Sequence, residues 1–336
     1  MGPLILRAEI EKWHLKAPFK ITGYTFEALN LLVVDLEMDG LIGRGEAAGV
    51  YYRGENAASM LKQLEQLRPS IEKGIDRESL RRLLPPGGAR SALDCALWDL
   101  EARLTGRPAW EIAKLDMPKP LLTTFTCGAD TPEVMVETAR TYKDARAIKL
   151  KLTGQPIDRD RIRAVREGLP EVWLGVDANQ GFSQQFLEEL MPVLVEMKVA
   201  LIEQPFPIGQ DSLLDNFQSP IPIAADESLQ SLGDIKAMAG RFNVVNIKLD
   251  KCGGLTEGLM MARAAREIGL DIMVGNMTGT SLGMAPAFLV GQLCDVVDLD
   301  GPVFLRRDRS IPVRYSDGRI SCPDELWGNT ERHRAR

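Results

Sequence analysis

Short apolar runs recur through the last two thirds of the chain, and stretches with the spacing of amphipathic helices separate them. The runs predict strands at residues 122–127, 147–152, 172–177, 200–203, 221–226, 244–249, 271–274 and 296–300. Because parallel strands need a crossover connection, usually a helix, this alternation predicts a parallel sheet. Eight strand and helix units favour a (β/α)-barrel, a modified TIM barrel, over a doubly wound sheet.

The first part of the chain follows a different pattern. Residues 29–38 and 41–47 have strand-like spacing on either side of Asp39-Gly40, which predicts a β-hairpin with a tight turn. Residues 18–25, which contain a proline and a glycine, are expected to form a loop with few internal ties. This loop is a candidate lid over the barrel.

Helical spacing takes over after residue 56 and is clearest at residues 91–104. Ser91 is expected to cap this helix, and Gly106 is expected to end it. The first part is therefore expected to be an α+β unit that caps the barrel. The expected organisation is a capping domain with lid loops at 1–117, a catalytic barrel at 118–305, and a C-terminal segment at 306–336 that packs back on the capping domain.

Two lysines stand in the predicted strand 147–152. Lys149 and Lys151 are two positions apart, so both side chains point to the same side of the strand. Inside a barrel, each ammonium group would cost several kcal/mol unless it met a carboxylate or lost its proton. The alternative is an edge strand whose lysines lie in water. The residues downstream favour a chemical role.

Carboxylates end three consecutive predicted strands. They are Asp177, Glu203 and Asp226. The catalytic face of such barrels lies at the C-terminal ends of the strands, and three neighbouring anions repel one another unless a cation lies among them. Hard oxygen ligands in this number suit Mg²⁺. The alternative is that each acid caps the following helix, which explains one of them more easily than all three.

A third strand lysine, Lys248, lies on the sixth predicted strand. The second and sixth strands face one another across an eight-stranded barrel, so Lys151 and Lys248 could reach opposite faces of one ligand. That arrangement suits an acid and base pair that moves a proton next to a carboxylate. Lys149 is placed to supply positive charge, which depresses the pKa of its neighbour and favours a developing enolate.

The last predicted strand carries two further acids. Asp298 and Asp300 share a face. Because the lysines and the metal already account for the reacting centre, this pair of anions is expected to need another positive partner. A substrate ammonium group is the simplest one. Capping by Asp300 is an alternative for one of the two residues.

Composition narrows the class of function. The chain has 336 residues and a formal net charge of −6, which disfavours a nucleic-acid surface. No apolar run approaches the roughly 20 residues of a membrane span, and the start has no secretory pattern. Five scattered cysteines argue for reduced thiols, so a cytoplasmic location is expected. With only two histidines, His14 and His333, a mid-chain histidine base is excluded.

The ordered set Lys149-x-Lys151, Asp177, Glu203, Asp226 and Lys248 resembles the enolase superfamily, in its muconate-lactonizing subgroup, over nearly the whole chain. Residues 89–100 also resemble a signature helix of that superfamily, and Asp298-x-Asp300 resembles the signature of its dipeptide epimerases. The resemblance implies a two-base 1,1-proton transfer that inverts the α-carbon of the C-terminal residue of a dipeptide. Lys151 and Lys248 would be the bases.

The same resemblance implies one Mg²⁺ per subunit, held by the three strand-end carboxylates, and an ammonium site at the aspartate pair. L-Ala-D/L-Glu epimerisation is the best-known activity of that group, whose members commonly carry an arginine in the lid loop. Residues 19–26 contain none, although Lys20 or Arg53 could substitute. Further candidate substrate contacts are Thr22, Tyr24, Arg53 and Met277. The sequence leaves open whether the subunits form a homo-oligomer.

Two other functions compete. A lyase or cycloisomerase of the same subgroup, such as o-succinylbenzoate synthase or muconate cycloisomerase, would use the same metal and lysines. Its substrate has no ammonium group, so Asp298 and Asp300 would face an anionic or neutral ligand, which repulsion disfavours. A non-catalytic binding protein on an inherited barrel is the other alternative. The presence of every acid, base and metal position weighs against it.

Overall fold

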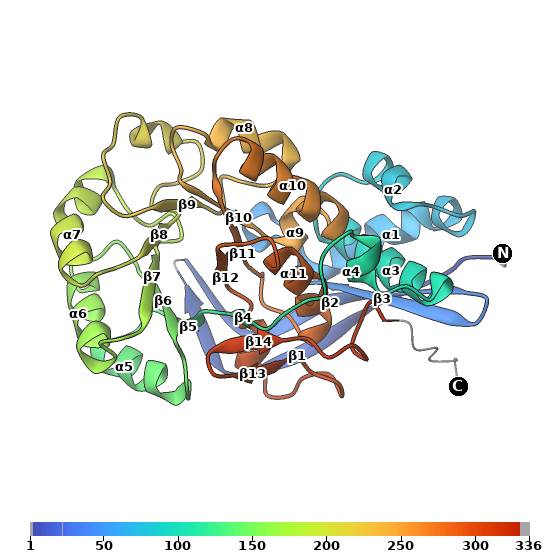
Figure 1. The fold of residues 1–336 in the computed structure, drawn as a ribbon, viewed down its shortest axis with the longest axis horizontal. Coiled ribbons are helices and arrows are strands. Elements are labelled where there is room, and N and C mark those ends of the chain that lie inside the picture. The colour runs from blue at the N-terminus through green and yellow to red at the C-terminus, as the bar shows by residue number, and fades with distance from the viewer. Residues whose placement is uncertain (1–2, 22, 330–336) are drawn as a thin grey trace.

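The computed structural model describes residues 3–21 and 23–329. An antiparallel three-stranded sheet comes first, in the order β1 (Ile5–Ile21), β2 (Tyr24–Met38) and β3 (Leu41–Ala47). The helical part of the capping unit follows, with η1 (Tyr51–Arg53), α1 (Ala57–Glu72), α2 (Arg77–Leu83), α3 (Gly88–Thr105) and α4 (Ala109–Ile112). Figure 1 shows these blue and cyan elements beside the barrel, with the tip of the β1–β2 hairpin reaching towards its strands.

Eight parallel strands form the second unit, in sequence order from one end of the sheet to the other. They are β5 (Phe125–Cys127), β6 (Ala147–Lys151), β7 (Trp173–Asp177), β8 (Leu201–Glu203), β9 (Ile223–Ala225), β10 (Val244–Ile247), β11 (Asp271–Val274) and β12 (Val296–Val297). The amide of Thr124, next to β5, donates a 2.9 Å hydrogen bond to the carbonyl of Val297 in β12. This bond joins the two ends of the row, and the predicted barrel is confirmed.

Helices follow the barrel strands on the outside (Figure 1). They are α5 (Pro132–Thr141), α6 (Asp158–Gly168), α7 (Gln184–Glu196), α8 (Ile235–Met238), α9 (Leu249–Cys252), α10 (Leu255–Glu267) and α11 (Ser281–Gly291), with 3₁₀ turns η2 (Asp211–Leu214), η3 (Leu232–Asp234) and η4 (Gly301–Phe304). Within residues 3–21 and 23–329, no helix has both the length and the apolar character needed to cross a membrane.

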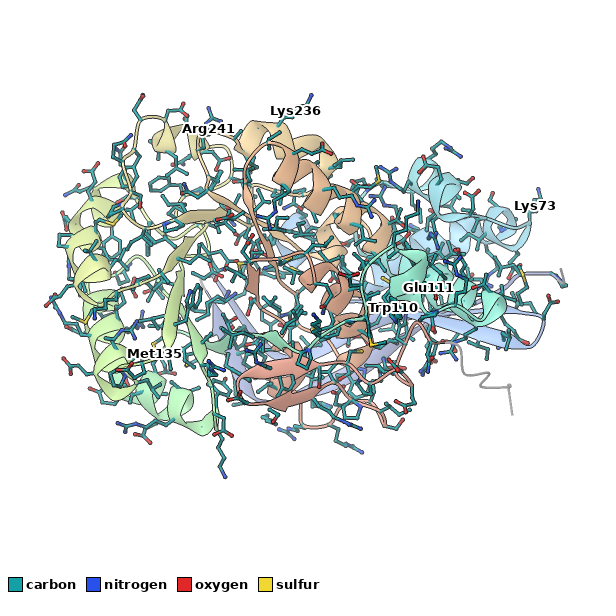
Figure 2. The ribbon with its side chains drawn as sticks, in the orientation of Figure 1. Lys73, Trp110, Glu111, Met135, Lys236 and Arg241 are labelled. Atoms are coloured by element: carbon teal, nitrogen blue, oxygen red, sulfur yellow. The ribbon has the colours of Figure 1, made fainter. Side chains whose placement is uncertain are left out.

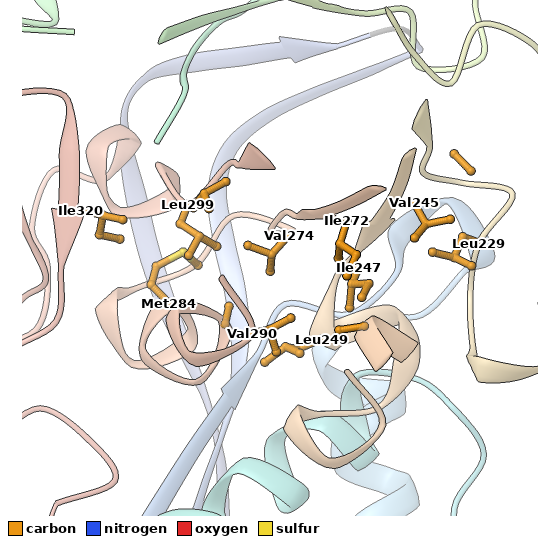
Figure 3. Packing of buried hydrophobic residues seen from close by; sticks show 14 of the residues in the cluster. Leu229, Val245, Ile247, Leu249, Ile272, Val274, Met284, Val290, Leu299 and Ile320 are labelled. Atoms are coloured by element: carbon orange, nitrogen blue, oxygen red, sulfur yellow. The ribbon is translucent and has the colours of Figure 1, made fainter. Parts of the chain in front are cut away.

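The core lies between the barrel strands and these helices. Figure 3 shows Ile247 of β10 and Val274 of β11 near Val290 of α11, and all three are fully buried. Each such side chain stabilises the fold by about 1.5–3 kcal/mol through burial. Charged side chains such as Lys73 and Lys236 instead point outward into solvent (Figure 2). The strands and helices therefore place these apolar residues inward and these charged residues outward.

The first predicted barrel strand is divided in two. Residues 121–122 form β4 (Leu121–Leu122), which pairs with β14 (Arg319–Ser321), and β14 pairs with β13 (Arg314–Ser316). The C-terminal segment thus pairs with the residues that lead into the first barrel strand. It also reaches the capping unit, because the Trp327 indole donates to the Arg44 carbonyl at 2.9 Å. The boundaries at 117 and 305 stay predictions.

The prediction of a loop with few internal ties at residues 18–25 is wrong. Its described residues lie in β1 and β2, where Phe19 pairs with Phe26 and Lys20 pairs with Thr25. The ladder shifts register between His14 and Phe19, which accommodates Pro18 and its missing N–H. Gly23, with φ of 79°, makes the turn. The region over the barrel is therefore a hairpin with paired strands.

The Asp39-Gly40 hairpin is confirmed, with both residues at positive φ. The expected start of the long helix is wrong, because α3 begins at Gly88 and Ser91 is buried inside it. Its end at Gly106, with φ of 66°, is confirmed. The helix is buried on nearly every side.

Gly45→Ala is expected to destabilise the capping unit by roughly 1–3 kcal/mol through overpacking. Helix α3 crosses β3 so closely that a β-carbon on Gly45 would overlap the carbonyl oxygen of Ala92 and lie 2.8 Å from the amide of Ala96. Denaturant unfolding measures the effect. Gly233→Ala is the matched control, because its nearest neighbour would be 3.6 Å away. Equal stability of the two variants would contradict this packing.

Candidate active site

The predicted chemical residues gather at the C-terminal ends of the barrel strands. Asp177 and Glu203 are the last residues of β7 and β8. Asp226 and Lys248 directly follow β9 and β10, and Lys151 ends β6. Because parallel strands present their ends at one edge, residues up to 149 positions apart in sequence meet here.

The three carboxylates form one cluster. One oxygen from each of Asp177, Glu203 and Asp226 lies within 4.8 Å of the others, and all three residues are buried. Each carboxylate is also held by a neighbouring donor. The Asn179 amide donates to Asp177 at 2.8 Å, the Asn246 side chain to Glu203 at 2.8 Å, and Lys251 to Asp226 at 2.5 Å. The cluster is therefore fixed in position and offers oxygen donors only.

Lysines cover the same carboxylates. Lys151 Nζ lies 2.5 Å from Asp177, Lys248 Nζ lies 2.6 Å from Asp226, and Lys149 Nζ lies 3.4 Å from Glu203. Burial alone would lower the pKa of Lys248, but the charges of Asp226, Glu203 and Glu227 hold it well above its ordinary value. Burial and the charge of Asp177 raise the pKa of Glu203 to about 7. Buried charges of both signs thus compensate one another.

This donor set fits a hard divalent cation. The converging groups are buried carboxylates at the ends of adjacent strands, which is the ligand chemistry that Mg²⁺ prefers. Helix capping does not describe this geometry, because Asp177 and Asp226 contact Lys151 and Lys248, and Glu203 accepts from the Asn246 side chain. The residues present are consistent with the predicted metal site.

Asp298 and Asp300 differ in their bonding partners and in the direction in which their pKa values are shifted. Asp298 contacts Lys149 directly and accepts from the Thr124 hydroxyl at 2.6 Å. Burial opposes its ionisation, but Lys149 holds the pKa of Asp298 below its ordinary value. Asp300 accepts from the Thr126 amide at 2.7 Å, and burial together with Asp298 raises its pKa to about 6.

Asp298 and Asp300 were both expected to need a positive partner from the substrate. This expectation is wrong for Asp298, which already has Lys149 as its partner. The two residues are 149 positions apart, and only the barrel closure brings them together. Asp300 has no ion-pair partner among the residues that the structure describes, so it is the aspartate whose charge is less compensated.

A cavity of about 550 Å³ opens over Lys151, Asp226 and Lys248. The β1–β2 hairpin, the segment after β3 and residues 276–278 make its walls, and the predicted contact Met277 lies in them. Its size is typical of a small-molecule site.

The other predicted substrate contacts have different surroundings. Thr22 lies outside the described residues. Tyr24 is 44% exposed and packs on Tyr51, with 4.6 Å between ring centroids. Arg53 donates to the side chain of Gln230 at 3.3 Å. Neither Tyr24 nor Arg53 is among the residues that line the cavity, and their roles stay predictions.

Several residues that line the cavity were not predicted from the sequence. Glu227 is buried beside the carboxylate cluster, where burial and the charges of Asp226 and Asp177 raise its pKa to about 8. Asn179 donates to it at 3.3 Å. Tyr51 and Tyr52 contribute aromatic wall from the capping unit. The adjacent acids at 226 and 227 were a usable signal, whereas nothing local indicated that the tyrosines would meet the barrel.

The capping unit is anchored next to one of the lysines. Asp250, two residues after Lys248, accepts from the amides of Ala48 and Gly49 at 2.7 and 3.1 Å. Arg90 of α3 makes a buried 2.7 Å ion pair with Glu257 of α10. These contacts position the segment that carries Tyr51 and Tyr52 over the strand ends.

Two family models match the chain. Residues 6–113 match the mandelate racemase / muconate lactonizing enzyme N-terminal domain, and residues 134–326 match the enolase C-terminal domain-like family. The chain therefore belongs to the mandelate racemase and muconate lactonizing enzyme family of the enolase superfamily, as the site residues predicted.

Relatives with named activities indicate the class of reaction within this family. The chain is 38% identical to L-Ala-D/L-Glu epimerase of Escherichia coli (92% of this chain, 97% of the relative). It is 39% identical to N-acetyl-D-glutamate racemase of Pseudoalteromonas (90% and 97%). It also resembles the crystal structure of the Methylococcus capsulatus dipeptide epimerase in complex with Mg and L-Arg-D-Lys, with a TM-score of 0.90, 31% identity, and coverage of 96% and 98%.

Proposed function

We propose that this protein is a Mg²⁺-dependent dipeptide epimerase that inverts the α-carbon of the C-terminal residue. The observation that carries the proposal is the placement of Lys151 and Lys248 beside one carboxylate cluster, under a cavity of about 550 Å³. The relatives support the reaction class, since their names describe inversion at the α-carbon of an amino acid or a dipeptide.

The two lysines would act as bases on opposite faces of the substrate. Lys151 ends β6 and Lys248 follows β10, and three strands separate β6 from β10 in the sheet. One lysine would take the α-proton, and the other would return a proton to the opposite face. The α-carbon then inverts without any change in the rest of the molecule.

Asp177, Glu203 and Asp226 would hold the metal ion through carboxylate oxygens. When bound, a divalent cation supplies positive charge where negative charge develops on the substrate carboxylate as the α-proton leaves. Carboxylates that hold a divalent cation would stabilise the ammonium groups of Lys151 and Lys248 less strongly than carboxylates that contact these lysines alone. A lysine relieved of its counter-ion in a buried site loses its proton more readily, as a base must.

Lys149 would keep its charge. Its Nζ contacts Asp298 directly and lies near Glu203, and these acids outweigh the effect of burial and hold the pKa of Lys149 above its ordinary value. A permanent cation beside the cluster favours negative charge on the reacting substrate. Lys149 is therefore an electrostatic partner of the reaction and a contact for the substrate carboxylate.

Asp298 and Asp300 would bind the substrate ammonium group, with Asp300 supplying the less compensated charge. A dipeptide has this ammonium, whereas an N-acylamino acid lacks it. The second candidate function is that of an N-acylamino acid racemase, because the chain is 39% identical to an N-acetyl-D-glutamate racemase. The ion pair between Asp298 and Lys149 favours this candidate, because Asp298 then needs no ammonium group from the substrate.

We also propose that the protein acts in the cytoplasm and that its binding partner is a small molecule. The five cysteines are unpaired thiols, which is consistent with a reducing cytoplasm. The partner would be a small dipeptide.

Incubation with a library of free dipeptides in deuterated water, in the presence of Mg²⁺, tests the function. α-Proton exchange in the C-terminal residue, followed by the appearance of the second epimer, is expected for a subset of the library. Exchange in N-acylamino acids alone would move the second candidate ahead. If no member of either group exchanges, the epimerase proposal is wrong and the cycloisomerase alternative returns.

Asp300→Asn is expected to weaken kcat/KM for the best free dipeptide strongly, because it removes a charge-assisted contact in a buried site. Truncating one partner of such a pair costs roughly 2–5 kcal/mol. The N-propionyl analogue has the skeleton of an L-Ala dipeptide without the amino group, so it removes the same contact from the other side. Wild type should lose about as much with this analogue, and the variant should lose little more.

The four combinations form a thermodynamic cycle on one contact. Asp298→Asn is the comparison variant, because it also leaves Lys149 without its nearest partner and should impair both substrates. If wild type turns over the N-propionyl analogue as well as the dipeptide, Asp300 does not bind an ammonium group.

A further inference from the structure

We propose that the residue inverted by this enzyme carries an uncharged, apolar side chain, and that the β1–β2 hairpin selects it. The inference rests on the proposed epimerase function and names the substrate class of the same site. It follows from the chemistry of the cavity wall.

Apart from the uncharged Asn30, the described hairpin residues that line the cavity are apolar. Leu15 and Phe19 come from β1, and Phe26, Leu29 and Leu31 come from β2. Phe19 and Phe26 lie opposite one another in the ladder. Phe19 packs on Phe304 at 4.7 Å and Phe26 packs on Tyr51 at 5.2 Å between ring centroids, so both rings are held in place. The wall is thus a preformed apolar surface.

Within the part of the cavity wall that the structure describes, no cation is free to pair with an acidic side chain. Among the described lining residues the cations are Lys151 and Lys248, which the cluster and the reaction already use. Lys20 on the hairpin lies 3.5 Å from Asp130, and Arg53 is bonded to Gln230. A glutamate side chain would therefore enter an apolar site without a counter-ion, which costs far more than leaving it in water.

The acids that line the cavity do not make a site for a cationic side chain either. Both oxygens of Glu55 are taken by backbone amides, those of Val50 and Gly88. Asp226 is bonded to Lys248 and Lys251. Glu227 lies with the carboxylate cluster and Asn179 at the strand ends, on the side of the reacting centre. Uncharged apolar groups are what the hairpin wall can receive.

The test measures kcat/KM for α-proton exchange in deuterated water with four substrates, L-Ala-L-Leu, L-Ala-L-Phe, L-Ala-L-Glu and L-Ala-L-Lys. We expect the apolar substrates to exceed the acidic one by roughly 100-fold or more, because a buried charged group is left unpaired. We expect the basic substrate to be disfavoured in the same direction.

Phe26→Arg supplies the missing cation on the wall and should raise the ratio of kcat/KM for L-Ala-L-Glu over L-Ala-L-Leu at least about tenfold, in the range of a charge-assisted contact. Thr25→Arg is the matched control. Thr25 is adjacent and exposed, and it does not line the cavity. The control adds the same charge to the same hairpin and should leave the ratio unchanged.

Each outcome of this assay supports or contradicts one of the two proposals. Preference of wild type for L-Ala-L-Leu or L-Ala-L-Phe, with a ratio shifted by Phe26→Arg alone, supports the proposal. If wild type exchanges L-Ala-L-Glu or L-Ala-L-Lys as well as the apolar pair, the side-chain assignment is wrong while the epimerase function stands. If none of the four substrates exchanges, nor any other dipeptide, both proposals fail together.

Discussion

Lys151→Arg and Lys248→Arg are each expected to lower the rate of epimerisation by about 10³-fold or more, in the range that general acid–base catalysis contributes. Each lysine serves one face of the substrate, so inversion needs both. Arginine keeps the positive charge that Asp177 and Asp226 require, but its pKa is too high for it to act as a base. Polarimetry or chiral chromatography of the product measures the loss.

The charge-preserving change separates catalysis from folding. Lys151→Ala would leave the buried Asp177 without its nearest ammonium partner, and the resulting instability would obscure the effect on catalysis. Lys236→Arg, at a lysine that points into solvent (Figure 2), is the matched control and should keep full activity. Substantial inversion by either active-site variant would remove that lysine from the mechanism.

Removal of divalent cations is expected to reduce activity by about 10³-fold or more, since a bound metal contributes several kcal/mol to stabilising developing charge. Added Mg²⁺ should restore it. Binding has a second readout, because a ligand at 100 times its Kd stabilises the native state by about 2.7 kcal/mol. Mg²⁺ should therefore raise the Tm of the protein.

Asp226→Asn should lose both effects, because Asp226 lies in the three-carboxylate cluster. Asp144→Asn is the matched control. This residue lies outside the cluster at φ of 60°, a conformation that asparagine also tolerates, and the variant should keep the Mg²⁺-dependent shift. Full turnover after exhaustive chelation would rule out the metal-assisted mechanism.

The barrel could be predicted because its strands are local signals. Runs such as Ile223–Ala225 are apolar on both faces, as strands buried in a parallel sheet are, and polar residues such as Asp226 mark their ends. The first and last strands differ from their predicted bounds. Residues 121–122 form the separate β4, and the last strand ends at Val297, after which Asp298 and Asp300 accept hydrogen bonds from Thr124 and Thr126 across the seam of the barrel.

Features that depend on distant contacts could not be predicted. Pro18 and Gly23 suggested a loop, yet the pairing of β1 with β2 extends through that region. Ser91 looked like a helix cap, yet α3 is packed between β3 and α9 and begins three residues earlier, at Gly88. Local propensity is a weak prior where tertiary packing decides.

The site divides in the same way. The positions of the strand-end acids followed from the parallel sheet, so the cluster of Asp177, Glu203 and Asp226 could be predicted from spacing. The contact between Lys149 and Asp298 could not, because it depends on how the barrel closes. The apolar wall of the cavity comes from the β1–β2 hairpin, which is distant in sequence, and no motif marks it.

Deuterium exchange at the α-carbon, followed by proton NMR from each pure epimer in turn, tests the two-base mechanism most directly. Lys151→Arg and Lys248→Arg should each exchange one epimer without inverting it, and the two variants should exchange opposite epimers. Equal exchange of both epimers by either variant, or exchange of the same epimer by both, would contradict the assignment of Lys151 and Lys248 to opposite faces.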